Sequence, residues 1–193
     1  MKKIIRCIFL CLALVSCISA AGCLDYFVFD EGSVTKQPTH DTSDTSVYLF
    51  EGTVIHVADG DTITVQLPNK KTERIRLLGI DTPEMDASKN GPNEYGSLSR
   101  AHLAIWAQKA KEFTTDKLLH ETVVISYDKK AGERDQYDRV LGYVTLDDGT
   151  DFNRVLLEKG YARVYTKETF DRKQEYKNAL QKAQNDEIGM WKE

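Results

Sequence analysis

Residues 59–84 read DGDTITVQLPNKKTERIRLLGIDTPE, and the pattern of their apolar side chains predicts two β-strands. Apolar and polar residues alternate strictly over 61–67, which is typical of a strand with one buried face. A second strand over 72–80 ends before Pro83, because proline lacks a ladder donor and restricts the residue before it. Another strand is expected upstream, over 48–57, where β-branched and aromatic residues are frequent. Three short strands joined by tight turns predict a β-meander.

Downstream of these strands the apolar period becomes helical. Over residues 96–119 apolar side chains recur at steps of three and four, with Lys and Glu on the other side. Two more strands are expected at 123–127 and 140–146, followed by a short helix over 153–159 and a last helix over 171–186. Five strands with a helix between the third and fourth form the element order of an OB-fold. The predicted class is therefore α+β, a five-stranded OB-fold β-barrel with three helices.

The composition is that of a globular protein without a strongly basic surface. The 193 residues include 26 Lys and Arg against 30 Asp and Glu, a formal net charge of −4. This balance excludes a protein that binds nucleic acid through overall positive charge. All four cysteines lie in the first 23 residues. The remainder therefore has neither a disulfide nor a cysteine zinc site.

The first 22 residues have the layout of an export signal. Three positive residues precede the uncharged apolar run 7–15, and small residues follow it. The run is too short for a standard transmembrane helix, although a short uncleaved anchor is the alternative. The stretch also resembles a prokaryotic lipoprotein signal, in which a small residue precedes a lipid-modified cysteine. Cys17 and Cys23 both qualify, and we favour Cys23 because a polar stretch follows it.

Residues 23–46 are interpreted as a flexible linker. From residue 31 onward they are mostly Ser, Thr, Asp and Gly, which cannot bury enough surface to offset the entropy of ordering. The ordered domain is expected over 47–193. Loss of residues 1–22 removes three positive charges and no negative one, which changes the formal net charge from −4 to −7. We expect a monomer, either secreted or held by a lipid anchor on the outer face of the cell membrane.

Three polar segments carry the candidate chemistry, and the first is Asp-Gly-Asp-Thr at 59–62. Strand alternation puts Asp61 on the apolar face of the strand that follows. A carboxylate there needs a partner, and oxygen-only ligands favour hard cations such as Ca²⁺. A plain Asp-Gly turn is the alternative.

The second segment, residues 74–84, combines a strand guanidinium with a turn that presents carboxylates. Arg76 could bind a phosphate, and Asp81 and Glu84 could bind a metal ion or act as a base. A surface Arg–Glu ion pair is the alternative. Strand parity leaves open whether Arg76 points inward, because apolar residues lie on both faces of this strand.

The third segment, residues 134–139, leads directly into a predicted strand. It holds Arg139 and the phenol of Tyr137, which together could stabilise and orient a phosphoryl group. A solvated hairpin loop is the alternative.

Together these segments resemble the staphylococcal nuclease family, from about Phe50 to Trp191. The resemblance rests on DGDT at 59–62, RLLGIDTPE at 76–84, Tyr-Gly at 95–96, DQYDR at 135–139 and the run 157–164. It implies an OB-fold barrel and a Ca²⁺-dependent phosphodiesterase. Such an enzyme cleaves DNA and RNA endonucleolytically, with single strands favoured, and leaves 3′-phosphates.

The resemblance also implies roles for single residues. Asp61 and Asp81 match the calcium-ligand carboxylates, and Thr82 matches a residue that binds the ion through its backbone carbonyl. Glu84 matches the proposed general base. Four further side chains match groups that contact the phosphate or the rest of the substrate: Arg76, Arg139, Tyr137 and Tyr165.

Two positions depart from the family pattern. Gln136 stands where the family often has Lys or Arg, which removes one cation that would face the phosphate. Asp138 stands where glycine is usual, and it adds a negative charge next to Arg139. Both changes bear on substrate affinity more than on reaction type.

Two classes of function remain open. The first is an exported calcium-dependent endonuclease. The second is a non-catalytic OB-fold envelope lipoprotein that binds nucleic acid or a protein, which predicts loss of part of the catalytic set. All five members of that set are present, which favours the enzyme: Asp61, Arg76, Asp81, Glu84 and Arg139.

Overall fold

The computed structural model describes residues 49–192, which all belong to one structural unit, 41–193. The predicted export signal, 1–22, and the linker, 23–46, lie outside the described residues. No helix in the described range has the length and apolar character needed to cross a bilayer.

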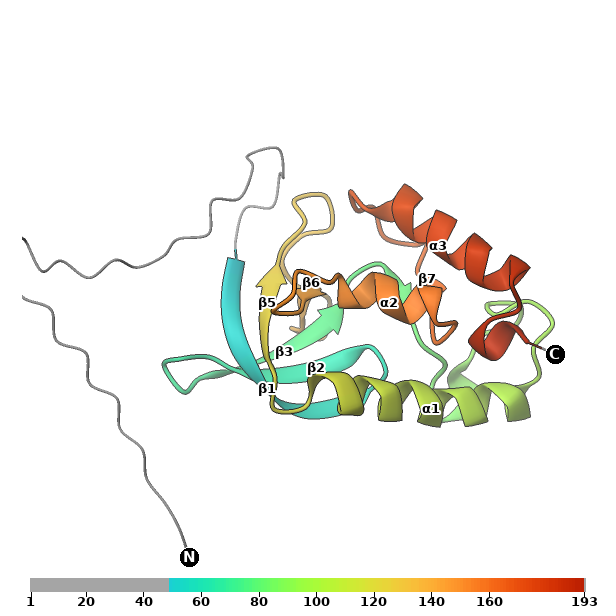
Figure 1. The fold of residues 1–193 in the computed structure, drawn as a ribbon, viewed down its shortest axis with the longest axis horizontal. Helices are drawn as coiled ribbons and strands as arrows, with labels where there is room; N and C mark the ends of the chain where they lie inside the picture. The colour runs from blue at the N-terminus through green and yellow to red at the C-terminus, as the bar shows by residue number, and fades with distance from the viewer. Residues whose placement is uncertain (1–48, 193) are drawn as a thin grey trace, which may run out of the picture. The chain divides into compact units, whose positions relative to one another are not determined.

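Within residues 49–192, five strands close into a barrel in the order β1-β2-β3-β6-β5 (Figure 1). β2 (Thr62–Gln66) pairs antiparallel with both β1 (Leu49–Asp59) and β3 (Thr72–Leu77), which is the predicted β-meander. β5 (Thr122–Ser126) pairs antiparallel with β1 and with β6 (Val140–Thr145), and β6 pairs parallel with β3. The five-stranded OB-fold and the α+β class are thereby confirmed.

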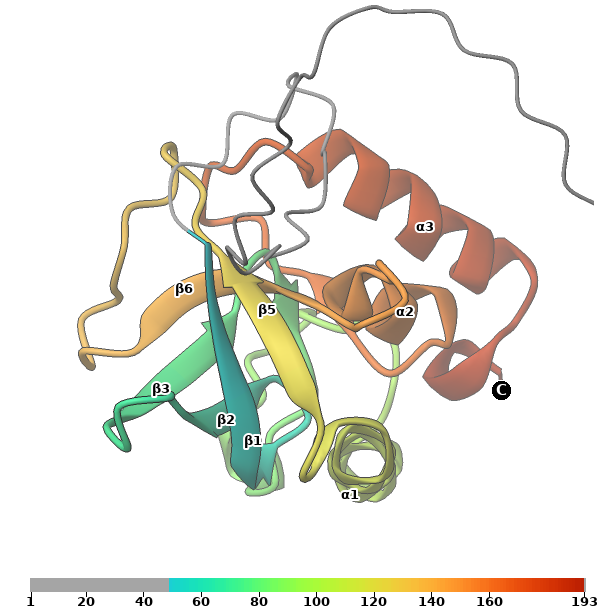
Figure 2. The ribbon, with the colours of Figure 1, turned by 60° about the vertical axis from the view of Figure 1, so that its left-hand side comes forward.

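Three α-helices in this part of the chain pack against the barrel. α1 (Arg100–Leu118) lies under the barrel end, while α2 (Phe152–Glu158) lies between the barrel and α3 (Lys173–Asn185) (Figure 2). All three begin and end within four residues of their predicted bounds. Ser99 and Asp151 cap α1 and α2, because each side chain accepts a backbone N–H of the first turn. Two short 3₁₀ helices complete the fold, η1 (Ala87–Lys89) and η2 (Gly189–Trp191).

The predicted strand 72–80 is wrong in its last part. β3 ends at Leu77, and the chain turns at Gly79, whose φ is 77° and where a Cβ would lie 2.5 Å from an aromatic ring. The next residues form β4 (Ile80–Asp81), which pairs with β7 (Arg163–Val164) outside the barrel. The apolar run continues through the break, so the pattern could not reveal it.

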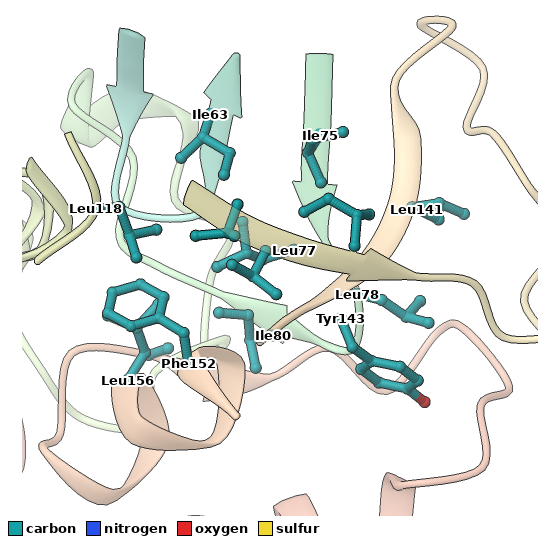
Figure 3. Packing of buried hydrophobic residues seen from close by; sticks show 14 of the residues in the cluster. Ile63, Ile75, Leu77, Leu78, Ile80, Leu118, Leu141, Tyr143, Phe152 and Leu156 are labelled. Atoms are coloured by element: carbon teal, nitrogen blue, oxygen red, sulfur yellow. The ribbon is translucent and has the colours of Figure 1, made fainter. Parts of the chain in front are cut away.

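The hydrophobic core fills the barrel and extends to α2 (Figure 3). Ile63, Ile75 and Leu77 are fully buried on adjacent strands, and Phe152 and Leu156 of α2 cover them. This packing fixes β2, β3 and the segment after β3 relative to one another. Those are the elements that carry most of the predicted site.

Candidate active site

The three polar segments of the sequence meet in one cleft of about 610 Å³. Seven of the predicted site residues line it: Asp61, Arg76, Asp81, Glu84, Tyr137, Arg139 and Tyr165. The eighth, Thr82, is buried and hydrogen-bonded to Asp61. The structure therefore brings all eight together.

Arg76 joins the two carboxylates predicted to bind a metal. Its Nη1 lies 3.1 Å from Asp61 Oδ2, and its Nη2 lies 2.9 Å from Asp81 Oδ1. The side chains of Asp61, Arg76 and Asp81 are only 7%, 13% and 15% exposed. Burial lowers the pKa of Arg76, but the two carboxylates raise it above its ordinary value. Arg76 thus points into the cleft and remains charged, which answers the question left open by strand parity.

Asp61 is also held by two threonines. Its Oδ2 accepts the backbone N–H of Thr82 at 2.7 Å and the Thr82 hydroxyl at 3.1 Å, and its Oδ1 accepts the Thr62 hydroxyl at 3.2 Å. These bonds fix the orientation of the carboxylate. The family resemblance implied only a backbone-carbonyl role for Thr82, whereas its amide and hydroxyl both donate to Asp61.

A third carboxylate, Asp59, lies beside this pair and was not among the predicted site residues. Its Oδ1 accepts the backbone N–H of Asp61 at 3.2 Å. Burial and the charge of Asp61 raise the pKa of Asp59 to about 7. The same two causes raise the pKa of Asp81 to about 6, against the opposing effect of Arg76 and Arg163. The site therefore concentrates negative charge that an added cation would offset.

The donor set suits a hard cation such as Ca²⁺. Carboxylate oxygens are among its preferred ligands, and Asp61 and Asp81 both line the cleft. Seven carboxylates and six cationic side chains of the described residues line the cleft, so a divalent cation would make it net positive. No group of three or more His, Cys, Asp or Glu within 49–192 already has a metal-binding arrangement. Guanidinium groups of Arg76 and Arg163 pair with the Asp61 and Asp81 oxygens.

Arg139 is held in the cleft by Asp135. Its Nε and Nη2 both lie 2.7 Å from Asp135 Oδ2, and its Nη1 donates to the Thr62 hydroxyl at 3.3 Å. Asp135 Oδ1 accepts the backbone N–H groups of Tyr137 and Arg139. Burial raises the pKa of Asp135, but the hydrogen bonds from Arg139 and Tyr137 bring it below its ordinary value. Asp135 was missed as a site residue, and its place four residues before Arg139 is the signal that could have identified it.

Glu84 is the exposed member of the acidic group. Its backbone N–H donates to Asn90 Oδ1 at 2.9 Å, which fixes the start of the segment between β4 and α1. A solvent-exposed carboxylate at the edge of a cleft is accessible to water and able to accept a proton from it.

The two predicted tyrosines lie on different parts of the cleft. Tyr137 is 64% exposed, and the Arg139 guanidinium lies 5.4 Å from its ring centre. Tyr165 is half-buried, with the Lys167 ammonium 5.9 Å from its ring centre. Both rings have a face near a cation, an arrangement that also suits a nucleotide base.

Asp138 adopts the backbone conformation usual for glycine, with a φ of 59°. Its carboxylate, however, lies 3.6 Å from Nη1 of Arg134, which itself binds Glu73. The acid that contacts Arg139 is Asp135 rather than its neighbour in the sequence, Asp138.

Two residues that sequence reasoning did not select hold the other side of Asp81. Arg163 Nη2 lies 2.6 Å from Asp81 Oδ2, and the Tyr95 hydroxyl donates to Asp81 at 3.2 Å. Arg163 faces Asp81 because β7 pairs with β4 in that register. Tyr95 belongs to the Tyr-Gly motif at 95–96, which carried part of the family resemblance but no predicted role in the site.

Comparison with known proteins gives consistent matches. Residues 74–193 match the family described as "Staphylococcal nuclease homologue". The chain is 34% identical to an uncharacterized protein of Methanocaldococcus jannaschii, over 95% of this chain and 93% of that protein. It is 32% identical to the thermonuclease of Staphylococcus hyicus, over 72% of this chain and 73% of the relative. It is also 31% identical to the micrococcal nuclease of Shigella flexneri, over 74% of each.

Proposed function

Because this chain belongs to the staphylococcal nuclease family, we propose that it is an exported, calcium-dependent endonuclease that hydrolyses phosphodiester bonds of DNA and RNA. Single strands are the favoured substrate, and the products carry 3′-phosphates. The observation that carries the proposal is the convergence in one cleft of paired carboxylates, two fixed guanidiniums and an exposed glutamate.

Asp61, Asp81 and the backbone carbonyl of Thr82 are the residues that would hold Ca²⁺. When bound, the ion would act as a Lewis acid that stabilises negative charge on the phosphoryl oxygens. The raised pKa values of Asp59 and Asp81 support a cation here, because both reflect carboxylates crowded in a buried place.

The two arginines would stabilise the negative charge that develops on the phosphoryl group during hydrolysis. Attack by hydroxide on a phosphodiester places additional charge on the equatorial oxygens, and fixed guanidiniums offset it without reorganisation. Arg139 is fixed by Asp135 and keeps N–H groups available for a phosphate. Arg76 contributes its charge next to Asp61 and Asp81, where the phosphate would approach a bound cation.

Glu84 would orient or deprotonate the attacking water. The exposure of its side chain and its place on the cleft support this role. Tyr137 and Tyr165 would contact the nucleotides through their ring faces. The protein would act as a monomer, secreted or lipid-anchored on the outer face of the cell membrane.

Cleavage assays with the purified chain test the proposal. Single-stranded DNA and RNA are incubated at low salt with Ca²⁺ or EGTA, beside Glu84→Gln and Arg139→Ala. We expect Ca²⁺-dependent cleavage and a loss of about 100-fold or more in each variant, as for other groups that act on the transition state. Arg74→Ala is the matched control, because Arg74 is an exposed β3 residue that does not line the cleft. A folded wild type that binds but does not cleave would instead favour the non-catalytic OB-fold module.

A further inference from the structure

One partly buried cation, Arg163, contacts both Asp81 and Glu94, which lies in the segment after β4. Its side chain is 12% exposed, and its Nη2 lies 2.6 Å from Asp81 Oδ2 and 3.4 Å from Glu94 Oε1. The guanidinium also lies 5.0 Å from the ring centre of Tyr95. Burial lowers the pKa of Arg163, but Asp81 and its other neighbours raise it above its ordinary value. Arg163 is thus a permanent charge between two acids.

Glu94 connects this cation to the backbone near Glu84. Its Oε2 accepts the backbone N–H of Gly91 at 2.8 Å. The preceding residue, Asn90, is buried and accepts the backbone N–H of Glu84 at 2.9 Å. The Glu94 carboxylate packs so closely that a Cβ on Gly91 would lie 2.7 Å from it. A continuous set of contacts therefore runs from Arg163 to Glu84.

We propose that Arg163 and Glu94 are positioning residues for Glu84. Their ion pair fixes the turn at Gly91 and, through Asn90, the backbone from which the Glu84 side chain projects. The inference rests on the proposed function, because it assigns Glu84 to phosphodiester hydrolysis. Since a misplaced catalytic group costs rate even when substrate binding is intact, the contribution belongs to the turnover step.

Kinetics separate this role from substrate binding. Glu94→Ala is expected to lower kcat about tenfold, because Glu94 acts on turnover through Glu84. KM should change by less than about threefold, because the Glu94 charge in the cleft is already paired with Arg163. Ca²⁺ affinity, measured by calorimetry, should also stay within about threefold, because Asp81 keeps its contact with Arg163. Gly91→Ala should give the same pattern, since the added methyl displaces the Glu94 carboxylate. Glu121→Ala, at an exposed glutamate before β5, is the matched control and should change nothing.

Hydrogen exchange in the full-length chain tests the contact without reference to catalysis. In Glu94→Ala the amides of 85–93 should exchange about tenfold faster than in the wild type or Glu121→Ala, with barrel amides unchanged. Unchanged exchange would overturn the proposed contact set. Faster exchange with unaltered kcat, or a large rise in KM with kcat intact, would overturn the positioning role. A wild type that never cleaves would overturn the proposed function and, with it, this role for Glu84.

Discussion

Glu168 places a negative charge in the cleft among the groups expected to bind phosphate. It is half-buried, on the segment between β7 and α3, and lines the same cleft as Arg76 and Arg139. Burial raises the pKa of Glu168, while the charges of Arg76 and Arg139 oppose that rise. A carboxylate that interacts with both arginines reduces the attraction of the cleft for a polyanion.

Glu168→Gln should therefore strengthen substrate binding. The substitution removes the charge and keeps the size of the side chain, so KM for single-stranded DNA should fall about threefold at low salt. The gain should shrink above about 0.3 M salt, because screening weakens the repulsion that was removed. Steady-state kinetics at two salt concentrations measure both effects, with Glu121→Gln as the control. A KM that is unchanged or higher at low salt would contradict this account of Glu168.

At the scale of elements, the site depends on a break in what looks like one continuous strand. The chain turns at Gly79, just after β3. β4 then pairs with β7, so that Asp81 faces Arg163. This pairing places Asp81 against a cation that lies far away in the sequence. The left-handed backbone and the close contact with Phe170 explain why this position is glycine.

Two glycine variants separate backbone strain from steric overlap. Gly79 and Gly149 have nearly equal φ values, 77° and 84°, but only Gly79 has neighbours at its Cβ position. We expect Gly149→Ala to cost about 1 kcal/mol of unfolding free energy from backbone strain. Gly79→Ala should cost about 3 kcal/mol, because the methyl would also overlap Phe170. Urea unfolding measures both, and equal losses would show that the contact with Phe170 is readily relieved.

Local sequence patterns predict part of this structure, whereas pairings between distant segments determine the rest. Apart from the break after Leu77, the strands and helices could be inferred because they follow local patterns. The eight predicted site residues lie in or beside one cleft, but Thr82 and Tyr165 came only from the family resemblance, and the roles of all eight stay predictions. Asp59 and Asp135 were missed although each lies within four residues of its partner, Asp61 or Arg139. Arg163 and Glu168 could not be assigned in the same way, because their roles arise from burial and from pairings such as β4 with β7, which no local window of sequence contains.

At the scale of the whole molecule, the net charge opposes the binding of a polyanion. The formal net charge is −4 for the full chain and −7 without residues 1–22. The molecule as a whole would repel a polyanion at long range, so binding must come from the local field of the cleft. We therefore expect affinity for DNA to fall as salt rises, with a slope that reflects few phosphate contacts.

Processing at the N-terminus is tested by cysteine variants in a bacterial host. We expect Cys23→Ser to abolish labelling by a fatty acid and to release the protein from the membrane fraction. Cys17→Ser should keep the label and stay in the membrane fraction. Both positions lie outside the residues that the structure describes. The reverse result would assign lipidation to Cys17, and a wild type without label would contradict the lipid anchor.

The central claim, that this cleft hydrolyses phosphodiesters with Ca²⁺ held by Asp61 and Asp81, is tested most directly by one titration. The initial rate of single-stranded DNA cleavage is measured against free Ca²⁺ for the wild type and for Asp81→Asn. We predict a saturable Ca²⁺ dependence in the wild type and a loss of about 100-fold or more in the variant, because one carboxylate ligand is replaced by a neutral amide. Cleavage that is independent of Ca²⁺, or an equal Ca²⁺ dependence in both proteins, would contradict it.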